Sequence, residues 1–142
     1  MATSFQVTFD CADPDALSKF WAALLGYTFE PPPEGSESWE DWARGMGIPE
    51  ESWNDAAATI DPEGAGPRLF FQKVPEGKSS KNRVHLDVNV GKGLRGEERH
   101  DVVRRDAERA AGLGATQVSV YDQRDEFWIV MQDPEGNEFC LQ

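Results

Sequence analysis

The sequence predicts an α+β fold made of two βαβββ units, because its two halves repeat the same order of elements. Each half contains a strand pattern, a helix pattern ending in Leu-Gly, two more strands, an Asp-Pro-Glu-Gly turn and a last strand. The turns at residues 61–64 and 133–136 are identical. An identical turn at the matching place of two matching halves is a stronger sign of an internal repeat than either signal alone. We therefore expect one domain over residues 1–142, with units at about 4–74 and 83–142.

In the first half, residues 5–10 alternate as in a half-buried strand, and Phe5 begins the apolar side. Asp13-Pro14 supplies a helix N-cap followed by a first-turn proline, and the helix pattern ends at Gly26. Further strands are expected at 27–30, 56–61 and 68–73. Residues 34–54 depart from strand patterning. There, Trp39, Trp42 and Met46 share one side of a short helix, which either plugs the core or lines a ligand pocket.

In the second half, residues 83–90 alternate through all eight positions. This pattern puts one set of side chains toward a core, namely Val84, Leu86, Val88 and Val90, and a polar set on the other face, namely Arg83, His85, Asp87 and Asn89. A charged helix is expected at 97–113, burying Val103, Ala107, Ala110 and Ala111. Strands follow at 115–121, 127–132 and 138–142.

The polar faces of the two halves are expected to line a cavity. If the helices cover the apolar faces on the outside, the other faces of two curved mixed sheets surround a central cavity. Aligning the repeat pairs Gln6 with His85, and Phe70 with Cys140. On strand parity the cavity side contains Gln6, Thr8, Phe70, Gln72, His85, Asp87, Glu138 and Cys140. A single histidine on a strand more often has a structural role. Because His85 matches Gln6 in the repeat, we weigh a functional role equally with a structural one.

Composition excludes several classes of partner. The 14 basic and 26 acidic residues give a net charge of −12, which argues against nucleic acid or an anionic membrane surface. The chain has no apolar run near the roughly 20 residues that cross a bilayer, and no signal peptide at its start, so we expect a cytoplasmic protein. Cys11 and Cys140 lack metal or redox spacing and are expected to be free thiols.

The chain resembles the vicinal oxygen chelate superfamily, which includes glyoxalase I, extradiol dioxygenases, fosfomycin-resistance proteins and bleomycin-binding proteins. Four stretches contribute to the resemblance: Gln6-Val7-Thr8-Phe9, the helix end at 20–27, Val84-His85-Leu86-Asp87-Val88 and residues 133–139. Residues 69–76 and 83–87 look like the glyoxalase-like subgroup. The resemblance implies a small organic ligand in the cavity and a homodimer.

It also implies a metal site with His or Gln, Glu, His and Glu as ligands, one from the first and one from the last strand of each unit. Gln6 and His85 match this pattern, whereas Phe70 and Cys140 stand where the glutamates would be. In glyoxalase I a glutamate also moves the substrate proton, so a ligand and a catalyst are both missing. We expect no tightly bound metal. A divalent metal, such as a soft ion on Gln6, His85 and Cys140, is the alternative.

Three functions follow. The first is a metal-independent enzyme with His85 as general acid/base, since histidines exchange protons near neutral pH, and with Asp87 or Gln6 orienting it. The second is a protein that binds or sequesters an aromatic metabolite or antibiotic. The third is a divalent-metal lyase or dioxygenase. The expected ligand-binding residues are Gln6, Trp39, Trp42, Phe70, Gln72, Trp128, Glu138 and Cys140. The acidic surface disfavours strongly anionic ligands unless a local Arg68 or Arg83 overrides the net field.

Overall fold

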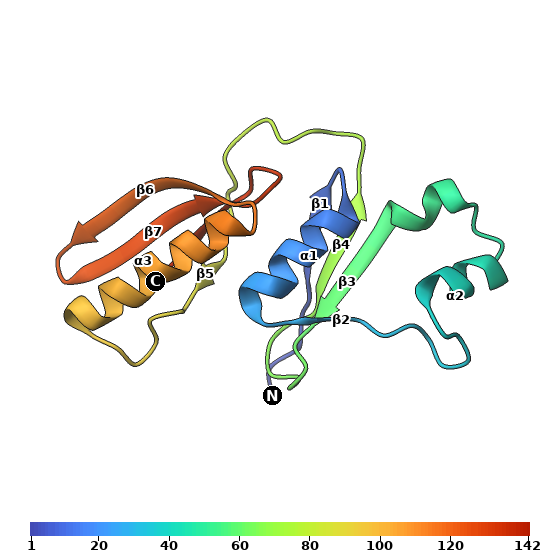
Figure 1. Ribbon diagram of the computed structural model, residues 1–142, viewed down its shortest axis with the longest axis horizontal. Helices are drawn as coiled ribbons and strands as arrows, with labels where there is room; N and C mark the ends of the chain where they lie inside the picture. Colours follow the sequence, from blue (N-terminus) through green and yellow to red (C-terminus); the bar gives the residue numbers. More distant parts are fainter. The chain divides into compact units, whose positions relative to one another are not determined.

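The computed structural model describes residues 1–142, which divide into two compact units, Met1–Gly77 and Lys78–Gln142 (Figure 1). Each sheet takes all four of its strands from one unit. In both units a helix connects the first strand to the second, and the first and last strands pair in parallel. The predicted pair of βαβββ units is confirmed.

Unit 1 contains a four-stranded sheet in the order β1-β4-β3-β2. Its elements are β1 (Val7–Cys11), α1 (Pro14–Leu25), β2 (Thr28–Phe29), α2 (Trp39–Gly45), the 3₁₀-helix η1 (Glu50–Asp55), β3 (Ala56–Ile60) and β4 (Leu69–Lys73). Helix α1 begins where the Asp13 carboxylate accepts the N–H of Ala16 at 3.2 Å, and it ends at Gly26, which has a φ of 73°. These are the predicted caps.

Unit 2 contains the equivalent sheet, in the order β5-β8-β7-β6. Its elements are β5 (Asp87–Val88), α3 (Gly96–Gly112), β6 (Thr116–Gln123), β7 (Glu126–Gln132) and β8 (Glu138–Leu141). Helix α3 lies along one face of this sheet (Figure 1). Val103 and Ala107 of α3 are buried, as are Phe127 and Met131 of β7. The opposite face of the sheet contains Trp128 and Cys140, and no helix of unit 2 lies on it; we call it the open face of unit 2.

The strand registers reproduce the alignment of the repeat. Thr8 lies opposite Phe70 in the β1–β4 ladder, and Asp87 lies opposite Cys140 in the β5–β8 ladder. Phe70 and Cys140 are therefore equivalent positions, as the alignment predicted. Gln6 lies two residues before Thr8, and His85 lies two residues before Asp87, so Gln6 and His85 are also equivalent positions.

The identical turns share one physical cause, an aspartate that accepts several main-chain N–H groups. Asp61 accepts from Glu63 at 2.9 Å and from Gly66 at 2.7 Å. Asp133, which is buried, accepts from Glu135 at 2.9 Å and from the N–H of Asn137 at 3.0 Å. These bonds, led by that from Glu63, lower the pKa of Asp61. The repeated sequence is thus a repeated turn geometry.

Some details of the predicted core were wrong. Phe5 and Val84 are 73% and 83% exposed, because each lies ahead of its strand, where the ladder has not begun. The strand expected over residues 83–90 is only Asp87–Val88. At its C-terminal end the N–H of Val90 bonds to the carbonyl of Val88 and turns the chain. Ala111 is also exposed, because it lies in the last turn of α3. Met46, expected on one side of a short helix with Trp39 and Trp42, follows the end of that helix, α2, and is 64% exposed. No helix is long and apolar enough to span a membrane.

Candidate functional site

Three reactive side chains meet on the open face of unit 2. His85, Asp87 and Cys140 bring a nitrogen, a carboxylate oxygen and a sulfur within 4.8 Å of one another. The parallel pairing of Asp87 with Cys140 creates this arrangement, and His85 joins it from two residues upstream. His85 Nδ1 lies 3.0 Å from Asp87 Oδ1, a hydrogen-bonding distance. We call these three residues the His-Asp-Cys cluster.

Cys140 is a neutral thiol in this cluster. Burial raises the pKa of the Cys140 thiol to about 11, and the charge of Asp87 and a hydrogen bond to it add to the effect. The S–H donates to the Asp87 carboxylate, so at neutral pH the sulfur is protonated. A thiol of this kind is a poor nucleophile, because the thiolate is the reactive form. Asp87 therefore faces two hydrogen-bond donors, the imidazole and the thiol.

Glu138, two residues before Cys140 on β8, is already engaged. It accepts the N–H of Asn82 at 3.0 Å and forms an ion pair with Lys78 at 3.2 Å. Burial alone would raise the pKa of Glu138, but the bonds from Asn82 and Lys78 outweigh it and lower that pKa. Glu138 therefore remains a paired carboxylate and is less suited than His85 to accept a substrate proton.

The equivalent positions in unit 1 surround a guanidinium group. Arg68 Nη1 donates to the side-chain oxygen of Gln6 at 2.9 Å, and Arg68 forms two hydrogen bonds with Glu30, at 3.2 and 2.7 Å. The same guanidinium lies 5.2 Å from the centre of the Phe70 ring. Gln72, the next residue on this side of β4, donates to Asp10 at 2.7 Å. The oxygen with which Gln6 would bind a metal therefore bonds to a cation.

These donors do not fit a hard divalent cation such as Mn²⁺ or Mg²⁺, which needs several oxygen ligands. Among the predicted site residues, unit 2 offers one carboxylate without a lysine or arginine partner, that of Asp87, which already contacts an imidazole and a protonated thiol. In unit 1 the Gln6 oxygen is bonded to Arg68, and Phe70 has no ligand atom. The N, O and S donors of the cluster are close enough to share one soft ion, provided that Cys140 loses its proton.

The predicted aromatic residues occur in both units. Trp128 of β7 stacks on Tyr121 of β6, with ring centres 4.9 Å apart and planes 10° from parallel. Trp39 and Trp42 belong to α2 of unit 1, where they meet edge to face, and the Trp39 indole N–H donates to the carbonyl of Glu30 at 2.8 Å. Sequence reasoning missed Tyr121, although the β6–β7 hairpin pairs it directly with Trp128.

Comparison with known proteins agrees with this architecture. A fosfomycin resistance protein, FosX, from Listeria monocytogenes, solved with Mn(II) and a dihydroxypropylphosphonic acid, has a TM-score of 0.64 and 13% identity, covering 100% of this chain and 90% of that one. A glyoxalase/bleomycin resistance protein/dioxygenase family enzyme from Burkholderia phytofirmans has a TM-score of 0.62 and 16% identity, with coverages of 96% and 94%.

A hypothetical protein from S. aureus has a TM-score of 0.59 and 11% identity, with coverages of 99% and 96%. At these identities the likeness shows the fold alone. No curated protein matches the sequence significantly. The model of the glyoxalase-like domain matches residues 6–142, which is nearly the whole chain. The protein therefore belongs to the glyoxalase-like family, within the vicinal oxygen chelate fold.

Proposed function

We propose that this protein is a metal-independent enzyme that acts on a small organic molecule, with His85 as the general base. The observation that supports this function is the 3.0 Å contact between His85 Nδ1 and Asp87 Oδ1. An aspartate on one imidazole nitrogen fixes the tautomer and stabilises the cation that forms when the other nitrogen takes a proton. Asp87 is thus the positioning residue, and His85 Nε2 is the atom that meets the substrate.

The position of the imidazole suits this role. The His85 side chain is 39% exposed, so a substrate can reach it, whereas Cys140 is almost fully buried behind it. A proton taken from a substrate carbon or hydroxyl moves to Nε2 and returns from there to a neighbouring substrate atom or to water. General base catalysis by a positioned side chain contributes about 10²- to 10⁴-fold in rate. Cys140 acts as a neutral donor that, with His85, orients the Asp87 carboxylate.

The same sheet face offers an apolar surface for the rest of the substrate. Trp128 and Val130 alternate with the buried Phe127, Ile129 and Met131, and Val130 lies beside Cys140 in the β7–β8 ladder. The stacked pair of Trp128 and Tyr121 suits a planar or aromatic group. This pair supports a second candidate function, the binding of an aromatic metabolite or antibiotic without turnover.

The test uses proton exchange, because a general base catalyses it before any complete reaction is known. The chelator-treated protein is incubated in D₂O with a panel of small carbonyl compounds, and deuterium incorporation is followed by NMR. We expect exchange of at least one compound, and the exchange rate should be lower by about 10²-fold or more in His85→Ala. Asp87→Asn should also reduce it. Asp55→Asn, the same chemical change at an exposed position of unit 1, should not.

The outcomes separate the candidates. Exchange that persists in a folded His85→Ala variant overturns the assignment of the base, and exchange seen only with protein that has not been treated with chelator overturns the metal-independent mechanism. If a compound quenches tryptophan fluorescence, is recovered unchanged and does not exchange, the binding function is supported instead. Trp128→Leu should then abolish the quenching.

A further inference from the structure

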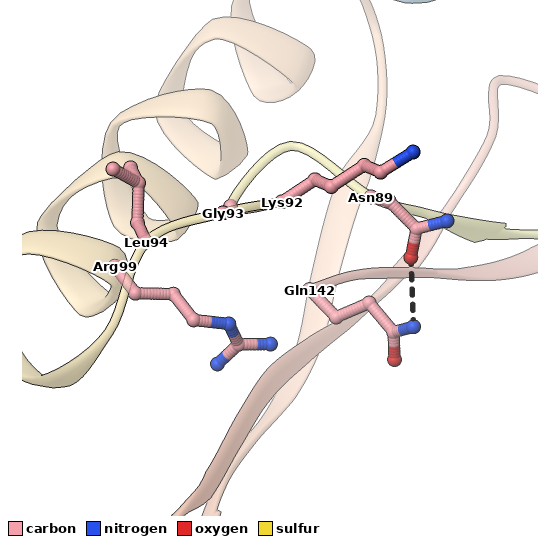
Figure 2. Close-up of a pocket in the computed structure, with 7 residues that line it drawn as sticks. Asn89, Lys92, Gly93, Leu94, Arg99 and Gln142 are labelled. Atoms are coloured by element: carbon pink, nitrogen blue, oxygen red, sulfur yellow. Dashed lines mark hydrogen bonds between the residues drawn. The ribbon is translucent and has the colours of Figure 1, made fainter.

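A second site lies in unit 2 at the carboxyl ends of β5 and β8. A pocket of about 280 Å³ is lined there by Asn89, Gly91, Lys92, Gly93, Leu94, Arg99 and Gln142. In Figure 2, Arg99 enters from α3, Gln142 lies between it and Asn89, and Lys92 extends from the glycine-rich loop on the Asn89 side. The cluster residues Asp87 and Cys140 lie two positions before Asn89 and Gln142. We call this pocket the strand-end pocket.

We propose that the strand-end pocket binds an oxyanion group of the substrate, a carboxylate or a phosphoryl group. The assignment of this group to the substrate rests on the proposed function. The pocket itself is argued from its charge: Lys92 and Arg99 line it, and no acidic side chain does. Neither cation forms an ion pair, in a chain with 26 acidic and 14 basic residues. A local field of this kind attracts an anion in spite of a net charge of −12.

The neighbouring cavity provides a contrast. It measures about 580 Å³ and shares Leu94 and Arg99 with the strand-end pocket, but Asp122 and Asp125 also line it. These carboxylates repel an anion and offset the charge of Arg95, which lines the same cavity. The anion is therefore assigned to the smaller pocket, where the surroundings are cationic and polar.

Arg99 is held in place before any ligand binds. Its Nη1 donates to the carbonyl of Phe127 at 2.8 Å, which leaves its other N–H groups to bind a ligand. Its stem packs over Gly91, where an added Cβ would lie 2.7 Å from Arg99 Cγ. Gln142 Nε2 donates to Asn89 Oδ1 at 2.9 Å, which orients the Asn89 amide and leaves its NH₂ group as a donor. A preorganised guanidinium and an oriented amide are typical of oxyanion recognition.

The spacing connects this pocket to the His-Asp-Cys cluster. Asn89 and Gln142 directly follow the last residues of β5 and β8, and two residues of extended chain advance about 7 Å, so an oxyanion beside Asn89 lies one short carbon chain away from Asp87. The substrate would then be a small organic acid or phosphorylated compound, with its anionic end in the strand-end pocket and its reacting atom beside His85. The earlier expectation that anionic ligands are disfavoured does not apply at this location.

The test measures binding of two probes, inorganic phosphate and acetate, to the full chain by calorimetry at low ionic strength. We expect saturable binding of at least one probe, weakened about tenfold or more by Lys92→Ala. Gly91→Ala should weaken it as well, because the new methyl group displaces Arg99 without changing the charge. Arg105→Ala removes the same charge from an exposed position on α3 and should leave binding unchanged. Arg99→Ala is less informative, since it also removes the bond to Phe127.

The probes identify the group, because binding of acetate alone indicates a carboxylate and binding of phosphate alone a phosphoryl group. No saturable binding of either probe overturns the proposal, as does an equal loss in Arg105→Ala and Lys92→Ala. His85→Ala should bind the probe like the unmodified protein. Probe binding together with unchanged exchange in His85→Ala would therefore refute the proposed base and leave the pocket supported.

Discussion

The protonation state of Cys140 decides between a neutral thiol and a nucleophilic or metal-binding thiolate, and it can be measured without a substrate. Burial and Asp87 raise the pKa of Cys140 from 9.0 to about 11. At pH 8 its thiolate fraction should therefore be about 100-fold lower than that of an ordinary cysteine. Because the residue is also 7% exposed, alkylation by iodoacetamide should be at least 100-fold slower in the folded protein than in urea.

The assay uses a Cys11→Ser background, in which Cys140 is the one remaining cysteine, and follows intact mass between pH 7 and pH 11. The rate should rise up to about pH 11. Asp87→Asn should raise the rate at pH 8 by less than 100-fold, since burial, the largest cause, remains. Alkylation at pH 8 as fast in the folded protein as in urea would refute the neutral thiol. The same shift predicts lower stability as pH rises from 9.0 through about 11, because folding favours the protonated form.

Three further predictions concern stability and metal. Phe71 is fully buried against α1 and stacks on Phe9. Phe71→Ala should therefore lower the free energy of unfolding by about 3–5 kcal/mol in urea titrations. Phe29→Ala, at a 53% exposed position, should lower it by under about 1 kcal/mol. Asp13→Ala should cost about 1 kcal/mol at pH 7 through loss of the helix cap. Hydrogen bonds from Asn54, the larger effect, and from Ala16 lower the pKa of Asp13, so this cost should shrink as the pH falls below 3.8. An equal cost at pH 7 and pH 3 would contradict this account. Chelator treatment should leave the melting temperature unchanged, and a clear fall that zinc reverses would instead support a metal on the cluster.

Most of the fold could be predicted from the sequence because its determinants are local. The Asp13 cap and the Gly26 stop delimit α1, and the alternation over residues 5–10 predicts the burial pattern of β1, in which Val7 and Phe9 are half-buried and Thr8 and Asp10 are exposed. The repeated turns could be aligned without any structure, and that alignment placed Phe70 and Cys140 at equivalent positions. The limits of edge strands were less predictable, since β5 pairs only with β8 and its length depends on where that neighbour begins and ends.

The candidate site could be predicted only in part. Strand parity placed His85, Asp87 and Cys140 on one face, which is where they meet. Arg68 bonds to Gln6, and Lys78 pairs with Glu138, through long, flexible side chains. These partners are 62 and 60 residues apart in the sequence, and strand or helix periodicity does not predict contacts of this kind. The strand-end pocket was missed for a related reason, because it joins a glycine-rich loop to a helix and a strand end.

The position of β8 has a consequence for the order in which the protein is completed during synthesis. Unit 1 has all its strands once Lys73 has been made, so its sheet can form early. In unit 2, β8 lies between β5 and β7, so two of the three strand pairs of that sheet cannot form until residues 138–141 have been made. A nascent chain that stops before this segment has a finished first unit and a second unit in which Asp87 has no neighbouring strand. Ribosome-stalled chains of increasing length would therefore show two separate folding steps, the second only after Leu141 leaves the exit tunnel.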